Sequence, residues 1–180
     1  MEKLFPKYFP HQVEIRKSLI FVILWRIIVP MKIQKILLSR IDTESDGWDN
    51  FIIDPHPQNI DRLAESLKRV GQIHPLVVRK DMDWLFLITG YARYLAMRKL
   101  NVVEAWARIF QKNELTDEQA LWIAVEAVCL FPFPPERQKL ILQKFRKIAG
   151  YTDSQLAEKV APAIGLEPTI DAVRSLINDD

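Results

Sequence analysis

The hydrophobic pattern of residues 31–112 switches between the periods of strands and helices. A short apolar run is typical of a first strand, and apolar residues at helical spacing then end at a glycine. Two β-rich runs follow, joined by a tight turn. The predicted order is strand 33–38, a helix with Ile60, Leu63, Leu67 and Val70 that stops at Gly71, strands 74–80 and 84–90 around the turn 81–83, helix 91–100 and strand 102–110. This order predicts an α+β fold with a small mixed sheet.

Residues 113–180 show only helical patterns. Two threonines are each followed three residues later by glutamine, which is the sequence of a capping box at a helix start. These pairs are Thr116 with Gln119 and Thr152 with Gln155. Helices are expected at 115–131, 136–150, 152–165 and 167–177. An α-helical domain is therefore predicted to follow the sheet domain.

The first 30 residues differ from the rest and are predicted to be an extension. The apolar run Ser18–Pro30 is shorter than the ~20 residues that span a bilayer, and Arg26 interrupts it, so we expect no integral membrane insertion. Met31 reads as the start of a domain, which fits a start codon assigned too far upstream. A peripheral membrane segment is the alternative. The predicted domains are the extension 1–30, the α+β domain 31–112 and the helical domain 113–180.

Composition and charge narrow the class of protein. With 49% hydrophobic and 27% charged residues, the chain is typical of a globular protein. The lone Cys129 excludes an internal disulfide and fits a cytoplasmic location, and the three histidines have no metal-ligand spacing, so no metal site is predicted. Lys and Arg outnumber Asp and Glu by thirteen to ten in residues 31–113, but residues 114–180 carry seven against eleven. This acidic tail disfavours strong non-specific DNA binding there.

The stretch "ITGYARYLAMRKL" places a glycine where a strand passes into a helix. Gly90 lets the backbone approach a ligand without a Cβ clash. The first N–H groups of the following helix lack internal partners and favour an anion, and Arg93 can add bidentate bonds to a phosphate. Alternatively, Gly90 only relieves a corner and Arg93 pairs with a surface carboxylate.

The order of these motifs resembles the N-terminal domain of the ParB/sulfiredoxin superfamily, of the partition-protein type. The resemblance rests on two motifs. The first is a "GQ…P" turn before a strand with a basic end, and the second is a later Gly-x-x-Arg turn that enters a helix. The resemblance implies a ParB/sulfiredoxin-like α+β domain and a nucleotide-binding pocket for a nucleoside triphosphate such as CTP. The implied pocket residues are Gly71, Gln72, His74, Pro75, Arg79, Gly90, Tyr91 and Arg93. Arg93 would hold phosphate, Gly90 would allow close approach and Gln72 would hydrogen-bond the ligand.

The chain also departs from the ParB pattern. The family turn is usually Gly-Glu-Arg-Arg, whereas Tyr91 and Ala92 stand here in place of the acid and one arginine. Of a second family motif, Glu-Asn-x-x-Arg, this chain keeps only the glutamate, Glu126, because Leu130 stands at the arginine position. Nucleotide hydrolysis is therefore not expected. Sulfiredoxin chemistry is excluded because the position of its catalytic cysteine, directly after the glycine, is occupied by Tyr91.

The tail resembles the helix-turn-helix region of ParB proteins, although only a degenerate one. Recognition helices carry donors that read base edges, and here Arg174 is the only basic residue on that helix. Arg98 and Lys99 are further candidates for DNA contacts. The alternative is a helical cap that packs on the sheet domain.

These features favour a ParB-like protein that binds DNA, a nucleotide or both, in DNA partitioning, mobile-element biology or transcriptional control. A homodimer or a protein partner is also compatible with the chain. A degenerate, non-catalytic module for protein–protein interaction is the main alternative. A ParB-like nuclease is a weaker one, because no carboxylate cluster for a metal is evident near Arg93.

Overall fold

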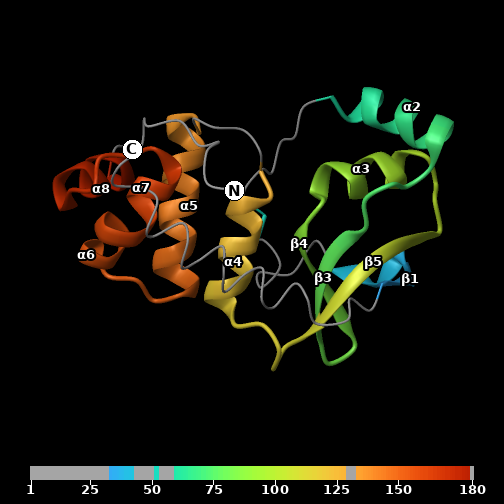
Figure 1. Cartoon of the computed structure of the whole chain (residues 1–180), viewed down its shortest axis with the longest axis horizontal. Helices are drawn as coiled ribbons and strands as arrows, with labels where there is room; N and C mark the ends of the chain where they lie inside the picture. Colours follow the sequence, from blue (N-terminus) through green and yellow to red (C-terminus); the bar gives the residue numbers. More distant parts are fainter. Residues whose placement is uncertain (1–32, 43–50, 53–58, 129–132, 179–180) are drawn as a thin grey trace, which may run out of the picture. The chain divides into compact units, whose positions relative to one another are not determined.

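The computed structural model describes residues 33–42, 51–52, 59–128 and 133–178 (Figure 1). The described residues belong to one compact unit within 33–180. The predicted extension 1–30 and Cys129 lie outside the described residues. The boundary predicted between residues 112 and 113 stays a prediction.

A mixed five-stranded sheet occupies the first part of the described chain. Its order is β1-β5-β3-β4-β2, with β5 antiparallel to β1 and parallel to β3, and β4 antiparallel to β3 and parallel to β2. The strands are β1 Ile33–Leu37, β2 Ile41–Asp42, β3 Leu76–Asp81, β4 Trp84–Thr89 and β5 Glu104–Gln111. Only β2 was not predicted. A two-residue strand has no periodicity, and β2 exists because its backbone pairs with β4.

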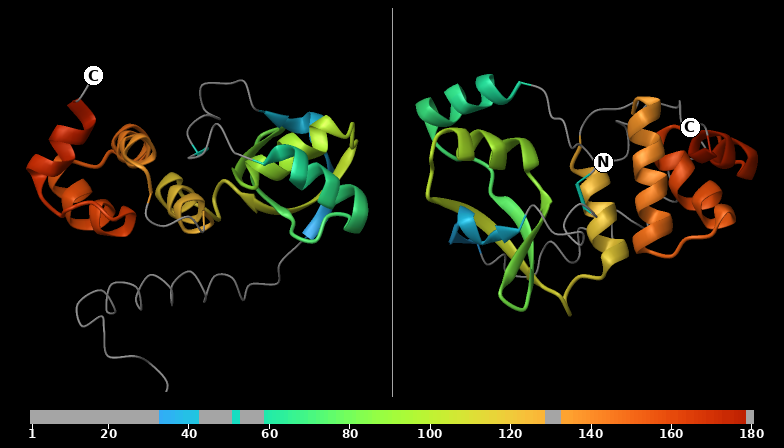
Figure 2. Two further views of the ribbon diagram at one scale, coloured as in Figure 1. Left: turned by 90° about the horizontal axis from the view of Figure 1, so that it is seen from above. Right: turned by 180° about the vertical axis from the view of Figure 1, so that it is seen from behind.

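Two helices, α2 (Ile60–Val70) and α3 (Tyr91–Lys99), lie side by side next to the sheet (Figures 1 and 2). α3 buries Tyr94, Ala96 and Met97 and is anchored in the sheet core. Ala64 is the only fully buried residue of α2, and its apolar stripe is partly buried at Ile60, Leu63 and Leu67 and exposed at Val70. This stripe was predicted from its helical spacing, but part of it faces a pocket instead of the core.

The helices of the second part share one core and also contact the sheet. They are α4 Asp117–Glu126, α5 Pro135–Ile148, α6 Asp153–Gln155, a π-helical turn Leu156–Val160, α7 Ala161–Ile164 and α8 Ile170–Asn178. Their core includes the fully buried Leu121, Phe145 and Leu156, together with Ile88 of β4 and Phe51. The chain is therefore an α+β protein, as predicted. Within the described residues, no helix combines the length and apolar character needed to cross a membrane.

Both predicted capping boxes are present. The Thr116 hydroxyl accepts a hydrogen bond from the Gln119 N–H at 3.2 Å, and the Gln119 side chain accepts from the Thr116 N–H at 3.1 Å. The Thr152 and Gln155 groups form the same pair of bonds at 3.3 and 2.9 Å. These contacts fix where α4 and α6 begin.

Thr152→Ala is expected to lower the free energy of unfolding by about 0.5–2 kcal/mol, because the Gln155 N–H loses its acceptor. Thr152→Ser keeps the hydroxyl and is expected to lower the free energy of unfolding by less than Thr152→Ala does. Urea denaturation of both variants measures the difference. Equal losses for Ala and Ser would show that the cap contributes nothing.

Candidate functional site

Gly90 is the hinge between β4 and α3. Its backbone is left-handed, with φ 102° and ψ 21°, and no side chain caps the helix at this position. A Cβ on Gly90 would lie 2.8 Å from Leu76 Cδ2 and 3.0 Å from Arg93 Nη2. Tyr94 makes the first helical hydrogen bond, to the Gly90 carbonyl at 2.9 Å. The glycine thus provides the space that the Arg93 guanidinium occupies next to the helix start.

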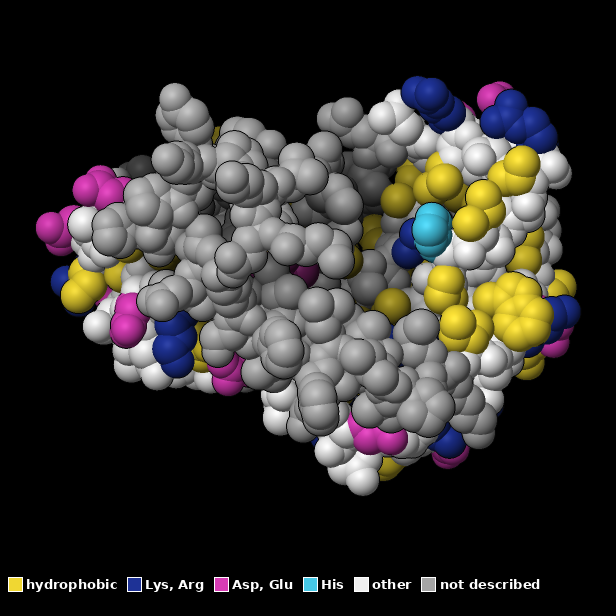
Figure 3. Space-filling model, viewed as in Figure 1, with side chains coloured by type: hydrophobic (Ala, Val, Ile, Leu, Met, Phe, Trp, Pro, Cys, Tyr) yellow, Lys and Arg dark blue, Asp and Glu magenta, His cyan; other side chains and the backbone are white. Residues whose placement is uncertain are grey.

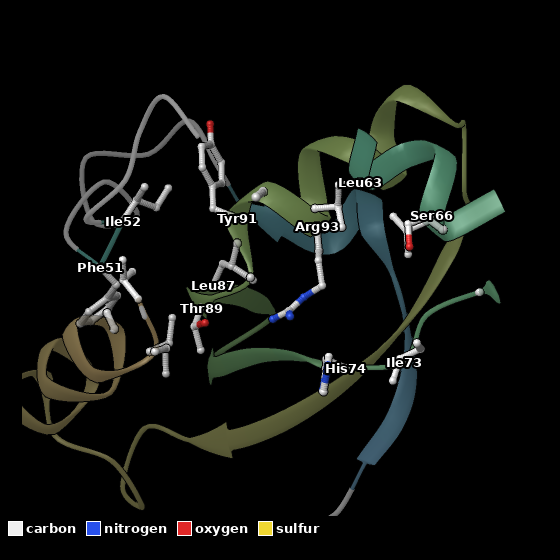
Figure 4. Close-up of a pocket in the computed structure, with 18 of the residues that line it drawn as sticks. Phe51, Ile52, Leu63, Ser66, Ile73, His74, Leu87, Thr89, Tyr91 and Arg93 are labelled. Atoms are coloured by element: carbon white, nitrogen blue, oxygen red, sulfur yellow. The ribbon is translucent and has the colours of Figure 1, made fainter. Parts of the chain in front are cut away.

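Arg93 is a partly buried cation for which the described residues provide no ion-pair partner. Its Nε is buried and forms no hydrogen bond, and no carboxylate among the described residues pairs with it. Burial lowers the pKa of the Arg93 guanidinium from its ordinary value. Figure 4 shows the side chain reaching from α3 into the pocket, between Thr89 and His74. An arginine in this position can bind an anion without first giving up an ion pair.

The pocket around Arg93 has a volume of about 360 Å³. It lies between α2, the loop after it, the junction of β4 with α3, and the end of α4. The lining residues are Phe51, Ile52, Leu63, Ser66, Leu67, Val70, Gly71, Ile73, His74, Leu87, Ile88, Thr89, Gly90, Tyr91, Ala92, Arg93, Ala124, Ala127 and Val128. Most of them are apolar, and Figure 3 shows hydrophobic side chains gathered around the histidine on this face.

The structure brings five of the eight predicted site residues into this lining. They are Gly71, His74, Gly90, Tyr91 and Arg93. The Tyr91 ring stacks on that of Tyr94, with 6.3 Å between the ring centroids. Gly71 ends α2 with a positive φ of 74°, which directs the following loop toward β3. Gln72, Pro75 and Arg79 are not among the lining residues.

Gln72 holds the loop to the sheet through its side-chain amide. Its Nε2 donates to the Trp106 carbonyl at 2.8 Å and to the His74 carbonyl at 3.1 Å. Its Oε1 accepts from the Trp106 N–H at 2.7 Å. A direct ligand contact by Gln72 would compete with these bonds, whereas they already position His74 at the pocket.

Arg79 connects β3 to the start of α4. It is 7% exposed, and its Nη1 lies 2.7 Å from Asp117 Oδ1 and donates to the Leu115 carbonyl at 3.2 Å. The guanidinium also stacks 4.8 Å from the centroid of the Phe51 ring. Arg79 is not a lining residue itself, but it packs against Phe51, which is, and so supports that wall of the site from behind.

The candidates for DNA contacts are exposed, and each already interacts within the chain. Arg98 donates to the Tyr94 hydroxyl at 3.0 Å, Lys99 pairs with Asp61, and Arg174 Nε donates to Asp153 at 2.8 Å. Glu126 is exposed near the end of α4 and is not a lining residue. The roles predicted for these residues stay predictions.

Sequence reasoning missed the contribution of α4 and of Phe51 to the pocket. Ala124, Ala127 and Val128 line it, although they are 31 or more positions beyond Arg93 along the chain. The sequence signal for α2 was its amphipathic spacing, and the structure shows that the part of this stripe not covered by the core lines the pocket. Among the described residues, no group of three or more His, Cys, Asp or Glu could hold a metal ion.

Solved structures with a similar arrangement include a ParB protein and a sulfiredoxin. The C-terminally truncated chromosome-partitioning protein ParB of Caulobacter crescentus, complexed with CTP-gamma-S, is 16% identical, and the match covers 81% of this chain and 76% of that one at a TM-score of 0.43. The same protein complexed to the centromeric parS site is 18% identical, with 80% and 70% covered and a TM-score of 0.43. Sulfiredoxin of Arabidopsis thaliana is 19% identical, with 45% and 89% covered and a TM-score of 0.34.

Among curated proteins, no sequence matches this chain. The family model of the ParB N-terminal domain matches residues 32–127, which is more than half of the chain. This range contains the sheet, α2, α3 and α4, and with them all the lining residues of the pocket except Val128. The chain therefore belongs to the ParB N-terminal domain family.

Proposed function

We propose that this protein binds a nucleotide by its phosphate at the start of α3. The observation that carries the proposal is the Arg93 guanidinium, which has a buried Nε without a hydrogen bond and no ion pair among the described residues, and which lies in a pocket of about 360 Å³ beside a helix N-terminus. Helix N-terminal amides and an arginine fork both suit phosphate oxygens. Membership of the ParB N-terminal domain family supports a nucleotide over other anions.

Each part of the pocket has a distinct role in this proposal. Arg93 binds the phosphate, and Gly90 keeps the space above the guanidinium free of a Cβ. Tyr91 and the apolar wall formed by Leu63 and Phe51 contact the rest of the ligand. Gln72 acts indirectly, since its bonds to Trp106 hold the loop that carries His74.

The first nucleotide to test is CTP, because the Caulobacter crescentus ParB was solved with CTP-gamma-S. The proposal covers binding and not hydrolysis. The family turn has lost its acidic residue here, and the pocket has no Asp or Glu among its described lining residues. A role in DNA partitioning, mobile-element biology or transcriptional control, with DNA as a partner, extends the proposal at the level of the family.

A non-catalytic module for protein–protein interaction is the second candidate function. Its support is a set of exposed apolar side chains around the loop after α2. Val70 and Ile73, which line the pocket, are 54% and 70% exposed, and Trp106, whose backbone is bonded to Gln72, is 45% exposed. A DNA-binding experiment across salt concentrations separates a role with DNA as a partner from the protein-interaction role. A steep fall of DNA affinity with salt indicates phosphate contacts, and no DNA affinity at low salt favours the protein-interaction role.

Arg93→Ala is expected to weaken nucleotide binding at least tenfold, because the phosphate loses its charge-assisted hydrogen bonds. Isothermal titration of the full chain with cytidine and adenosine nucleotides measures the loss. Arg62→Ala is the matched control, since Arg62 is exposed on α2 and outside the pocket lining. Equal affinities for the natural protein and Arg93→Ala would contradict the proposed site.

A further inference from the structure

The described lining of the pocket offers its ligand one fixed cation. Among the described lining residues, Arg93 is the only Lys or Arg, and none is Asp or Glu. The positive charge that this described lining turns toward a bound anion therefore comes from Arg93 and from the start of α3.

This charge matches one phosphate group. A phosphate ester carries about 1.5–2 negative charges near neutral pH, whereas a helix N-terminus contributes roughly half a positive charge beside the full charge of Arg93. A triphosphate would bring further charge into the pocket with no second Lys or Arg among the described lining residues to compensate it. Burying a charge without a partner is costly, so the second and third phosphates would have to remain in water.

The rest of the pocket suits an apolar or aromatic body. Leu87 and Ile88 are 1% and 3% exposed at its base, and Leu63, Leu67 and Phe51 form its sides. Tyr91 adds a ring that stacks on Tyr94 and is thereby held in place. A volume of about 360 Å³ falls in the range of pockets for small organic molecules.

We infer that the pocket selects a monophosphate ester with an aromatic body over a nucleoside triphosphate. The inference rests on the proposed phosphate site at Arg93 and specifies which phosphate ligand that site accepts. The Arg93 fork and the α3 amides hold the single phosphate. The aromatic body lies along the apolar wall, where its burial adds affinity that inorganic phosphate cannot gain.

Isothermal titration of the full chain with five probes tests this inference. The probes are CMP, CDP, CTP, phenyl phosphate and inorganic phosphate, each with and without Mg²⁺. We expect CMP to bind at least tenfold more tightly than CTP, phenyl phosphate to bind more tightly than inorganic phosphate, and Arg93→Ala to weaken both monoesters at least tenfold. Arg62→Ala is expected to bind CMP and phenyl phosphate with the affinity of the natural protein.

A variant that adds a cation tests the charge argument directly. Ser66 lines the pocket from α2, so Ser66→Lys supplies the missing second cation. We expect the ratio of CTP to CMP affinity to rise at least fivefold in Ser66→Lys. An unchanged ratio would overturn the charge argument, provided that the circular dichroism spectrum shows an intact fold.

The remaining outcomes separate the inference from the proposed function. If CTP binds as tightly as CMP or more tightly, and Arg93→Ala weakens it, the nucleotide function stands and the preference for monophosphates is wrong. If phenyl phosphate binds through Arg93 but no nucleotide binds, the preference stands and the nucleotide function is wrong. If no probe binds, both are wrong.

Discussion

Gly90→Ala is expected to lower the free energy of unfolding by about 2–6 kcal/mol. A non-glycine residue at a φ of 102° is strained by roughly 1–3 kcal/mol, and overpacking adds about 1–3 kcal/mol. The overpacking arises because the new Cβ would lie 2.8 Å from Leu76 Cδ2, and Leu76 is fully buried. Since the Cβ would also lie 3.0 Å from Arg93 Nη2, the guanidinium must move and anion binding should weaken.

Gly150→Ala is the matched control for this prediction. Gly150 also has a positive φ, 68°, but a Cβ there meets no atom within 4 Å. Only the backbone strain applies, which costs about 1–2 kcal/mol. Urea denaturation of both variants gives the two losses, and titration with CMP gives the effect on the site. Equal losses of stability would mean that the close approach to Leu76 is relieved without cost.

Asp117→Ala is expected to lower the free energy of unfolding by about 2–4 kcal/mol. The substitution leaves the Arg79 guanidinium, whose side chain is 8% exposed, without its carboxylate partner. Removing one member of a fully buried ion pair costs about 3–5 kcal/mol, and the value is lower here because the Asp117 side chain is 50% exposed. Asp117 also lies in the first turn of α4, where a negative charge is favourable.

The reverse substitution, Arg79→Met, is expected to cost less than Asp117→Ala. It removes the buried charge and leaves Asp117 in contact with water, although the Leu115 carbonyl loses a donor. Urea denaturation of both single variants and the double variant isolates the pair. Lys112→Ala, which breaks an ion pair whose lysine is 63% exposed, is the control and should cost at most about 1 kcal/mol. A larger loss for Arg79→Met than for Asp117→Ala would contradict this ordering.

The Arg79–Asp117 pair also affects the candidate site. It joins β3 to the start of α4, and α4 supplies Ala124 to the pocket together with the following Ala127. A weakened pair should therefore loosen one wall of the pocket, even though neither partner lines it. Binding of phenyl phosphate by Asp117→Ala, compared with Lys112→Ala, measures this effect.

Interactions between residues close in the sequence made the starts and ends of several helices predictable. Thr116 and Thr152 mark helix starts because their hydroxyls accept from nearby N–H groups, and Gly71 ends α2 because it adopts a positive φ. Such interactions span only a few residues, so the sequence contains both partners. The short strand β2 was missed for the opposite reason, since it is defined only by pairing with the distant β4.

The candidate site was predictable in part. Gly90 and Arg93 are neighbours on one turn, so their common position in the pocket follows from the sequence. Gln72 and Arg79 are polar residues near the same motif, but their side chains bond elsewhere, Gln72 to Trp106 at a separation of 34 residues. No local pattern indicates such a partner.

The sequence by itself determined the α+β class, most helices and strands, and the family, because these depend on periodicity, caps and the order of local motifs. The tertiary structure decided which polar side chains remain available to a ligand. It engaged the Gln72 amide in hydrogen bonds to the loop and the sheet, paired Arg79 with Asp117, and left Arg93 as the one Lys or Arg among the described lining residues of a largely apolar pocket. Whether a polar group is available to a ligand depends on all the neighbours that folding brings to it, and those neighbours lie far away in the sequence.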